Sequence, residues 1–131
     1  RREGLGNVTF LGAIPDEDKV ALLTLCYGVV FPSHLRAEAF GVSLLEGAMF
    51  GKPMISSEIG TGTSHVNVGG VTGLVVPPGD SAALRAALAR LLDEPQLAQQ
   101  MGRNARARYL ELFRAEQMCA SYAELYRGVL R

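Results

Sequence analysis

Short apolar runs that alternate with helical patterns are the feature that most limits what this chain can fold into. The clearest run covers residues 28–31 (GVVF), which are continuously apolar and end at Pro32. Such a run is typical of a strand that is buried on both faces of a parallel sheet. Similar runs predict further strands at residues 8–11, 53–57 and 74–76.

Helical patterns separate and follow these runs. Pro15 opens a helix that runs to residue 25, with Asp16 as its cap, and a second helix begins near Gly41 and ends near residue 49. After residue 78 the pattern is wholly helical: Asp80 caps one helix, Pro95 opens the next, and a third begins near residue 115. The order predicts an α/β fold with a Rossmann-like parallel sheet, flanked by helices and followed by a helical C-terminus.

Apolar stripes on the last two helices are expected to be core and packing surface. The first stripe comprises Leu97, Met101, Ala105 and Tyr109, and the second comprises Met118, Tyr122, Leu125, Tyr126 and Val129. Their helical spacing makes a packing role more probable than cofactor binding.

The segment EAFGVSLLE at residues 38–46 predicts a ligand site. Glu38 and Glu46 are separated by seven residues, at the point where an apolar run gives way to a helix. A helix that begins near Gly41 directs free N–H groups and its positive dipole end forward, which favours phosphate. Ala39 and Phe40 cannot cap this helix as Ser or Asp would, so we expect a bound anion to take that role.

The two carboxylates suit a ligand that carries hydroxyl groups beside its phosphate. Ionised carboxylates accept hydrogen bonds strongly, and sugars offer rows of hydroxyl donors. A sugar nucleotide therefore fits the segment. The simpler alternative is that Glu38 is a solvated loop residue and Glu46 an ordinary residue on a helix surface.

A second ligand contact is expected in the loop at residues 58–64, which also follows a strand. Ligands of doubly wound sheets bind beyond the carboxyl ends of the strands. Candidates in this loop are Thr61, Thr63 and Ser64. Its Gly-x-Gly does not extend to a dinucleotide fingerprint, because His65 occupies the third glycine position.

Length and composition agree with one domain. The chain has 131 residues, 48% of them hydrophobic, and 13 basic residues balance 13 acidic ones, so no overall field favours nucleic acid. No stretch approaches the ~20 apolar residues of a membrane span. Cys26 and Cys119 are interpreted as reduced packing residues within helices of a cytoplasmic protein.

Five sequence blocks resemble those of the retaining GT4-type glycosyltransferases, which have the two-domain GT-B architecture. The blocks are FPSH (31–34), EAFG (38–41), LEGAM (45–49), GKP (51–53) and GLVVPP (73–78). They match the C-terminal, nucleotide-sugar-binding domain from residue 8 to the final helix. The resemblance implies that Glu38 contacts the donor sugar, as our catalytic candidate, and that Glu46 holds the ribose.

The resemblance also implies the remaining ligands of the site. Backbone amides would approach the sugar and the diphosphate, and Gly41 would permit that approach because it lacks a side chain. The donor-binding residues expected are Phe40, Gly41, Val42, Ser43, Glu46 and Thr61. The expected ligand is a UDP sugar or a GDP sugar, with no metal and no further cofactor.

By the same resemblance, residues 1–131 are expected to be a partial donor-binding domain that lacks the acceptor domain and two preceding strands. We expect such a fragment to be inactive alone. The missing strands would lie between the first two strands predicted here, which would expose the edge at residues 28–31. Exposed edges pair, so we expect either closure of residues 8–11 onto this edge or a homodimer through it.

The function predicted is retaining hexosyl transfer by the full-length protein to a glycan or lipid-linked acceptor, in polysaccharide biosynthesis. The expected location is cytoplasmic, with membrane-peripheral attachment left open. Two alternatives stand beside this prediction: a nucleotide-sugar epimerase of related architecture, and a non-catalytic nucleotide-binding or interaction module.

Overall fold

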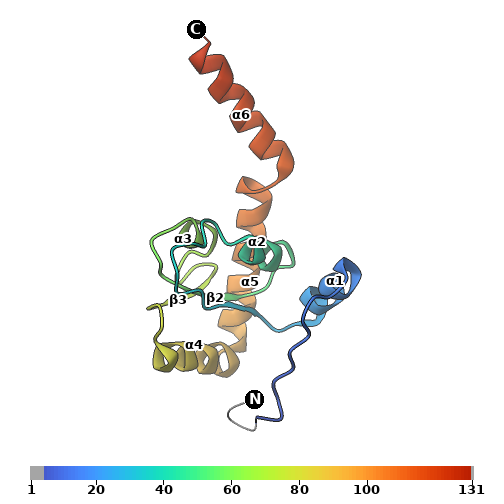
Figure 1. Ribbon diagram of the computed structural model, residues 1–131, viewed down its shortest axis with the longest axis vertical. Helices are drawn as coiled ribbons and strands as arrows, with labels where there is room; N and C mark the ends of the chain where they lie inside the picture. Colours follow the sequence, from blue (N-terminus) through green and yellow to red (C-terminus); the bar gives the residue numbers. More distant parts are fainter. Residues whose placement is uncertain (1–4, 131) are drawn as a thin grey trace.

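The computed structural model describes residues 5–130, in which three parallel strands are surrounded by helices (Figure 1). The expected Rossmann-like α/β arrangement is confirmed. In chain order the elements are α1 (Asp16–Leu25), β1 (Val29–Phe31), α2 (Val42–Met49), β2 (Met54–Ser57), α3 (Thr63–Val66), β3 (Gly73–Val76), α4 (Ser81–Asp93), α5 (Pro95–Leu112) and α6 (Ala115–Val129).

The sheet has the order β1-β2-β3, with every neighbouring pair parallel. All four residues of the central strand β2 are buried. Gly73 lies opposite Met54, and a Cβ atom at position 73 would be 2.0 Å from the carbonyl oxygen of Met54. Only glycine therefore allows β3 to lie this close to β2.

Two apolar clusters cover the two faces of the sheet. Met54 and Ile55 are neighbours in β2, so their side chains point to opposite faces. Ile55 packs with residues of β3, α4 and α5, whereas Met54 packs with residues of α2, α3 and α5. Figure 1 shows α4 on one side of the strands and α2 with α3 on the other. The apolar stripe predicted on α5 has a packing role, because its residues Met101 and Ala105 are buried.

Local signals at the element ends are mostly confirmed. Asp80 caps α4, because its Oδ1 accepts a hydrogen bond of 2.8 Å from the amide of Ala83. Pro95 is the first residue of α5. Asp16, in contrast, is the first residue of α1 and not its cap; Pro15 occupies the cap position without a side-chain hydrogen bond.

The strand expected at residues 8–11 is absent, although these residues are described. Val8, Phe10 and Leu11 are 51%, 84% and 54% exposed. A strand needs a neighbour to satisfy its backbone groups, and this segment has none among residues 5–130. The expectation that it closes onto the edge of β1 is therefore wrong.

β1 is also less buried than its sequence predicts. It forms one edge of the sheet, and Val30 is 41% exposed. Burial on both faces was expected for this strand, but the structure gives that environment to β2. Continuous apolar sequence thus marked a strand correctly and misplaced it within the sheet.

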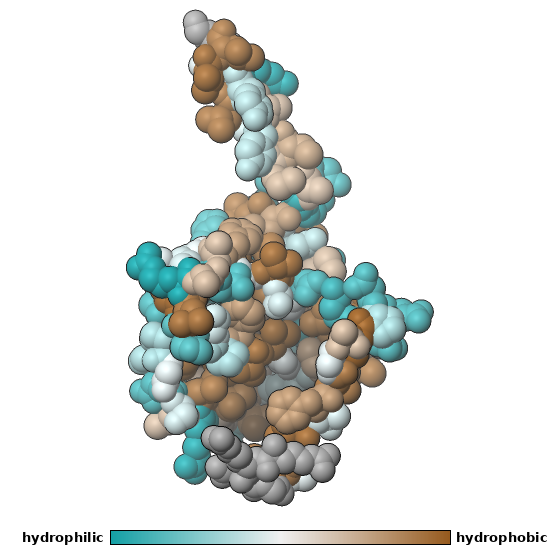
Figure 2. Space-filling model, in the orientation of Figure 1, coloured by the Kyte–Doolittle hydropathy of each residue, from teal (hydrophilic) through white to brown (hydrophobic). Residues whose placement is uncertain are grey.

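The helix α6 projects from the rest of the chain (Figure 1) and buries none of its residues within the described part. Its stripe is therefore not core here: Tyr122 is 57% exposed and Val129 is 75% exposed. Figure 2 shows apolar side chains gathered toward the free end of this arm. Cys119 lies in α6 as a free thiol, whereas Cys26, also free, follows α1 and does not lie inside it.

Candidate functional site

Two loops meet at the carboxyl ends of β1 and β2, where the sequence predicts the site. The amide of Gly62, in the loop after β2, donates a hydrogen bond of 2.8 Å to the carbonyl oxygen of Ala39, in the loop after β1. A Cβ atom on Gly62 would be 2.7 Å from Cδ2 of Phe40. This close contact fixes the loop that leads into α2 against the loop at residues 58–62.

Glu38 caps the turn before α2. Its Oε1 accepts hydrogen bonds from the amide of Gly41 at 2.8 Å and from the amide of Phe40 at 3.3 Å. Gly41, at the N-cap position, adopts a left-handed conformation with φ of 85°. No side chain caps α2 itself, as expected: Glu38 binds the amides of Phe40 and Gly41 in the turn before the helix, because the left-handed turn brings these amides back to a carboxylate three residues earlier.

The next two amides remain open. The amides of Val42 and Ser43 have no hydrogen-bond acceptor among residues 5–130, and both residues are exposed. The amides of Leu44 and Leu45 instead donate to the carbonyl oxygen of Gly41. The predicted amide ligands therefore divide into two groups: Phe40 and Gly41 are capped by Glu38, and the following pair is accessible to a ligand.

Glu46 faces α1. Its Oε1 accepts a hydrogen bond of 2.8 Å from Nζ of Lys19, which also lies 3.3 Å from Oδ1 of Asp16. The hydrogen bond to Glu46, followed by that to Asp16, raises the pKa of the Lys19 ammonium above its ordinary value of 10.5. Lys19 and Asp16 belong to no motif shared with Glu46, so nothing in the sequence signals this ion pair.

The second predicted loop is organised by Glu58. Its Oε1 accepts hydrogen bonds from the amide of Gly60 at 2.9 Å and from Oγ of Ser64 at 3.2 Å. Thr63 is buried as the first residue of the short helix α3, which was not predicted. Thr61 is only half-buried, and its hydroxyl lies 3.3 Å from that of Thr63. Of the three predicted residues, Thr61 is thus the one best placed to reach a ligand.

An aromatic cluster behind the first loop was missed by the sequence analysis. The ring of Phe113 lies 6.1 Å from the ring of Phe40 and 5.5 Å from the ring of His65, both edge to face. Arg108 lies over Phe113, 5.7 Å from its centroid, and its Nη2 donates to the carbonyl oxygen of His65 at 2.7 Å.

Two hollows lie at opposite ends of the sheet. A small one of about 180 Å³ lies at the carboxyl ends of the strands, between Pro32, His34 and Ser57 on one side and Pro77 and Asp80 on the other. It lies at the end of the sheet where the two loops meet, which is where parallel sheets bind ligands.

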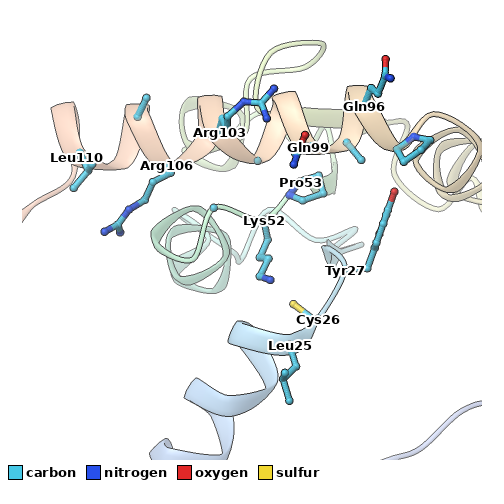
Figure 3. Close-up of a pocket in the computed structure, with 15 residues that line it drawn as sticks. Leu25, Cys26, Tyr27, Lys52, Pro53, Gln96, Gln99, Arg103, Arg106 and Leu110 are labelled. Carbon is cyan, nitrogen blue, oxygen red and sulfur yellow. The ribbon is translucent and has the colours of Figure 1, made fainter.

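A larger open hollow of about 920 Å³ lies at the opposite end, beside Tyr27 and Pro53, the residues before β1 and β2 (Figure 3). It contains none of the predicted site residues. Lys52 points toward α1, where its Nζ donates to the carbonyl oxygen of Thr24 at 2.8 Å, and Arg103 points away from Lys52. These cations do not converge, so this hollow is not our candidate site.

Two kinds of feature are absent from the described part of the chain. Among residues 5–130, no three His, Cys, Asp or Glu side chains gather as metal ligands would. Within the same range, no helix combines the length and the apolar character that crossing a bilayer requires.

The family of the chain follows from comparison with known proteins. The family model described as "Glycosyl transferases group 1" matches residues 1–108. The chain therefore belongs to the group 1 glycosyltransferase family, and the resemblance noted in its sequence blocks is confirmed. The match favours transfer of a sugar over the epimerase alternative.

Individual relatives agree. Over 112 residues the chain is 69% identical to the D-rhamnosyltransferase WbpZ of Pseudomonas aeruginosa. The aligned part makes up 86% of this chain and 29% of the relative. Over 130 residues it is 51% identical to the O-antigen chain mannosyltransferase C of Escherichia coli. Here the aligned part makes up 99% of this chain and 35% of the relative. The chain thus spans about a third of the length of these relatives.

Solved structures share the fold. The sucrose-phosphate synthase of Thermosynechococcus elongatus superposes with a TM-score of 0.82 at 34% sequence identity. The matched part makes up 93% of this chain and 30% of the synthase chain. HepE of Anabaena, in complex with UDP-glucose, superposes with a TM-score of 0.85 at 27% sequence identity. The matched part makes up 97% of this chain and 34% of the HepE chain.

Proposed function

We propose that this chain binds the nucleotide-sugar donor of a retaining glycosyltransferase. The observation that carries the proposal is the pair of open amides at Val42 and Ser43, beside the carboxylate of Glu38. A helix N-terminus with free N–H groups favours a diphosphate. The similarity to HepE, whose structure holds UDP-glucose, supports a ligand of this class.

Glu38 is suited to hold the sugar while it caps the turn. Its Oε1 accepts both amide hydrogen bonds, and its Oε2 accepts none from any described residue. A carboxylate has about four acceptor positions, so Oε2 is available to sugar hydroxyls without loss of the cap. The capped turn also fixes the direction of that oxygen before the donor arrives, which reduces the ordering that binding requires.

Glu46 is proposed to hold the ribose while its carboxylate keeps the hydrogen bond from Lys19. The side chain of Glu46 is 30% exposed and that of Lys19 is 41% exposed, so hydroxyl groups can approach the carboxylate from solvent. Its second oxygen, Oε2, accepts no hydrogen bond from the described residues, which leaves an acceptor for the ribose while Lys19 stays on Oε1.

The proposed sugar is a hexose, and the names of the relatives support this class. The rhamnosyl- and mannosyltransferases that match the chain support hexosyl transfer, and the O-antigen chain named for one of them supports a growing polysaccharide as the acceptor. The chain spans about a third of these relatives, so acceptor binding is assigned to the remainder of the longer enzyme. The donor is a UDP sugar or a GDP sugar, bound without a metal.

The experiment is calorimetric titration of the full-length protein with UDP, GDP and their hexose derivatives. We expect one nucleotide to bind, and its sugar derivative to bind more tightly. The Glu38→Gln variant should lose about tenfold in affinity for the nucleotide sugar, because hydrogen bonds to charged groups are worth about 1.5 to 3 kcal/mol, and should keep its affinity for the nucleotide alone.

The matched control is Glu111→Gln, a loss of one exposed carboxylate near the end of α5. It should leave both affinities unchanged. A folded wild-type protein that binds none of these nucleotides, or a Glu38→Gln variant that binds the nucleotide sugar as tightly as the wild type does, would contradict the proposal.

A further inference from the structure

Phe113 connects the end of α5 to the loop that carries the proposed donor site. It is the residue that follows α5, and it packs against the apolar cluster around Leu44 and Met54. Its ring contacts the ring of Phe40 edge to face, with centroids 6.1 Å apart and an interplanar angle of 77°. Phe113 is 73 positions from Phe40 in the sequence, and their contact is long-range.

The ring of Phe40 is held from a second direction. Gly62 lies so close that a Cβ atom there would be 2.7 Å from Cδ2 of Phe40. The backbone of Phe40 donates to Glu38 and immediately precedes Gly41, whose left-handed conformation begins α2. A change in the position of this ring therefore changes the direction of the amides that follow it.

Phe113 itself is fixed from behind. Arg108 lies over its ring at 5.7 Å, and His65 meets it edge to face at 5.5 Å with an interplanar angle of 84°. Nε and Nη2 of Arg108 both donate to the carbonyl oxygen of His65, at 3.1 Å and 2.7 Å, so α5 is tied to α3 at this point. A planar guanidinium with two parallel hydrogen bonds holds one orientation, which a lysine would not do.

We propose that Phe113 is a positioning residue for donor binding: it sets the ring of Phe40 and, through it, the amides of residues 41–43. This inference rests on the proposed function. Phe113 does not contact the ligand itself. Its effect is on donor affinity, because a small displacement of groups that hold a ligand weakens every hydrogen bond they make.

The test is a double-mutant cycle in the full-length protein, with the affinity for the nucleotide sugar measured by calorimetry. Phe113→Leu keeps an apolar side chain and removes the ring edge, and Phe40→Leu removes the partner ring. Each variant should lose about two- to tenfold in affinity, the range that an edge-to-face pair supports. The double variant should lose little more than either single variant, because both remove the same contact.

Two controls separate positioning from a general loss of stability. Leu97→Ala removes an apolar group that packs against the other cluster, around Ile55, far from the loop. It should lower the melting temperature and leave donor affinity unchanged. Phe113→Tyr keeps the ring edge and should keep wild-type affinity.

The outcomes are distinct. Additive losses in the cycle, or an equal loss of affinity in Leu97→Ala and Phe113→Leu, would overturn the positioning role while the wild type still binds the donor. A wild-type protein that binds no nucleotide sugar would overturn the proposed function and this inference with it.

Discussion

At the scale of single residues, the candidate site depends on a carboxylate that has a structural role the sequence did not predict. Glu38 was selected as a sugar ligand beside an uncapped helix, and it also accepts hydrogen bonds from two backbone amides in the turn before that helix. Its role as a sugar ligand stays a prediction. The sequence did not predict the two hydrogen bonds to the turn, because the reach of the side chain depends on the left-handed conformation of Gly41.

Because Glu38 has this structural role, two substitutions of this residue should differ in their effect on the free energy of unfolding. Glu38→Ala should lower the free energy of unfolding by about 1 kcal/mol, because it removes the acceptor of two backbone hydrogen bonds in the turn before α2. Glu38→Gln keeps an acceptor oxygen and should stay within about 0.5 kcal/mol of the wild type. Urea denaturation followed by circular dichroism measures both. Equal stability of the two variants would show that the cap contributes nothing.

Gly41 gives a second prediction at this scale. Its φ of 85° strains any residue with a side chain, and a Cβ atom there would be 3.0 Å from Cδ1 of Leu44 and 3.2 Å from Cγ2 of Thr63. Gly79 has a similar φ of 75° with nothing within 4 Å. Gly79→Ala should therefore show the backbone strain alone, about 1 kcal/mol, and Gly41→Ala should lose clearly more, by thermal unfolding. Equal losses would mean that the neighbours of Gly41 yield freely.

At the scale of elements, the sequence predicted those whose signals are local. β2, β3, α4 and α5 form where apolar runs, an Asp cap and an initial proline indicate them. The expected strand at residues 8–11 has an apolar run but no neighbouring strand among the residues described. α3 was missed because its four residues carry no periodic pattern, and its first residue is held by the fold around it.

The packing of α5 against the turn after α2 predicts opposite effects for two helical glycines. A Cβ atom on Gly102 would be 2.2 Å from the carbonyl oxygen of Gly51, whereas Gly128 in α6 has nothing within 4 Å. Gly102→Ala should lose about 1 to 3 kcal/mol of stability by overpacking. Gly128→Ala should gain up to about 1 kcal/mol in α6, because alanine favours a helix. Calorimetric unfolding of both variants checks the signs, and a stabilised Gly102→Ala variant would contradict the close approach.

At the scale of the whole molecule, β1 presents an edge with no partner strand in the described part of the chain. The residues around it include exposed apolar side chains, among them Val30 at 41% exposure. Exposed edges of this kind pair with other chains. A homodimer through this edge remains a prediction. The alternative, in which residues 8–11 pair with this edge, is not what the structure shows.

The dimer is tested by sedimentation of this chain over a range of concentrations. We expect a concentration-dependent dimer that Val30→Lys abolishes, because a charge on the edge opposes pairing. Val71→Lys is the matched control, since Val71 is 48% exposed in the loop before β3. A monomer at every concentration would refute pairing through β1.

The bare helix α6 has a consequence for motion. Its 15 residues are close to the length below which a lone helix is marginal in water, and within residues 5–130 it has no buried side chain to add stability. Backbone amides in α6 should therefore exchange their protons with deuterated solvent far sooner than those of α5, whose buried positions open only with the core. Slow exchange along α6 would reveal that its apolar stripe is covered, and the protected amides would mark where.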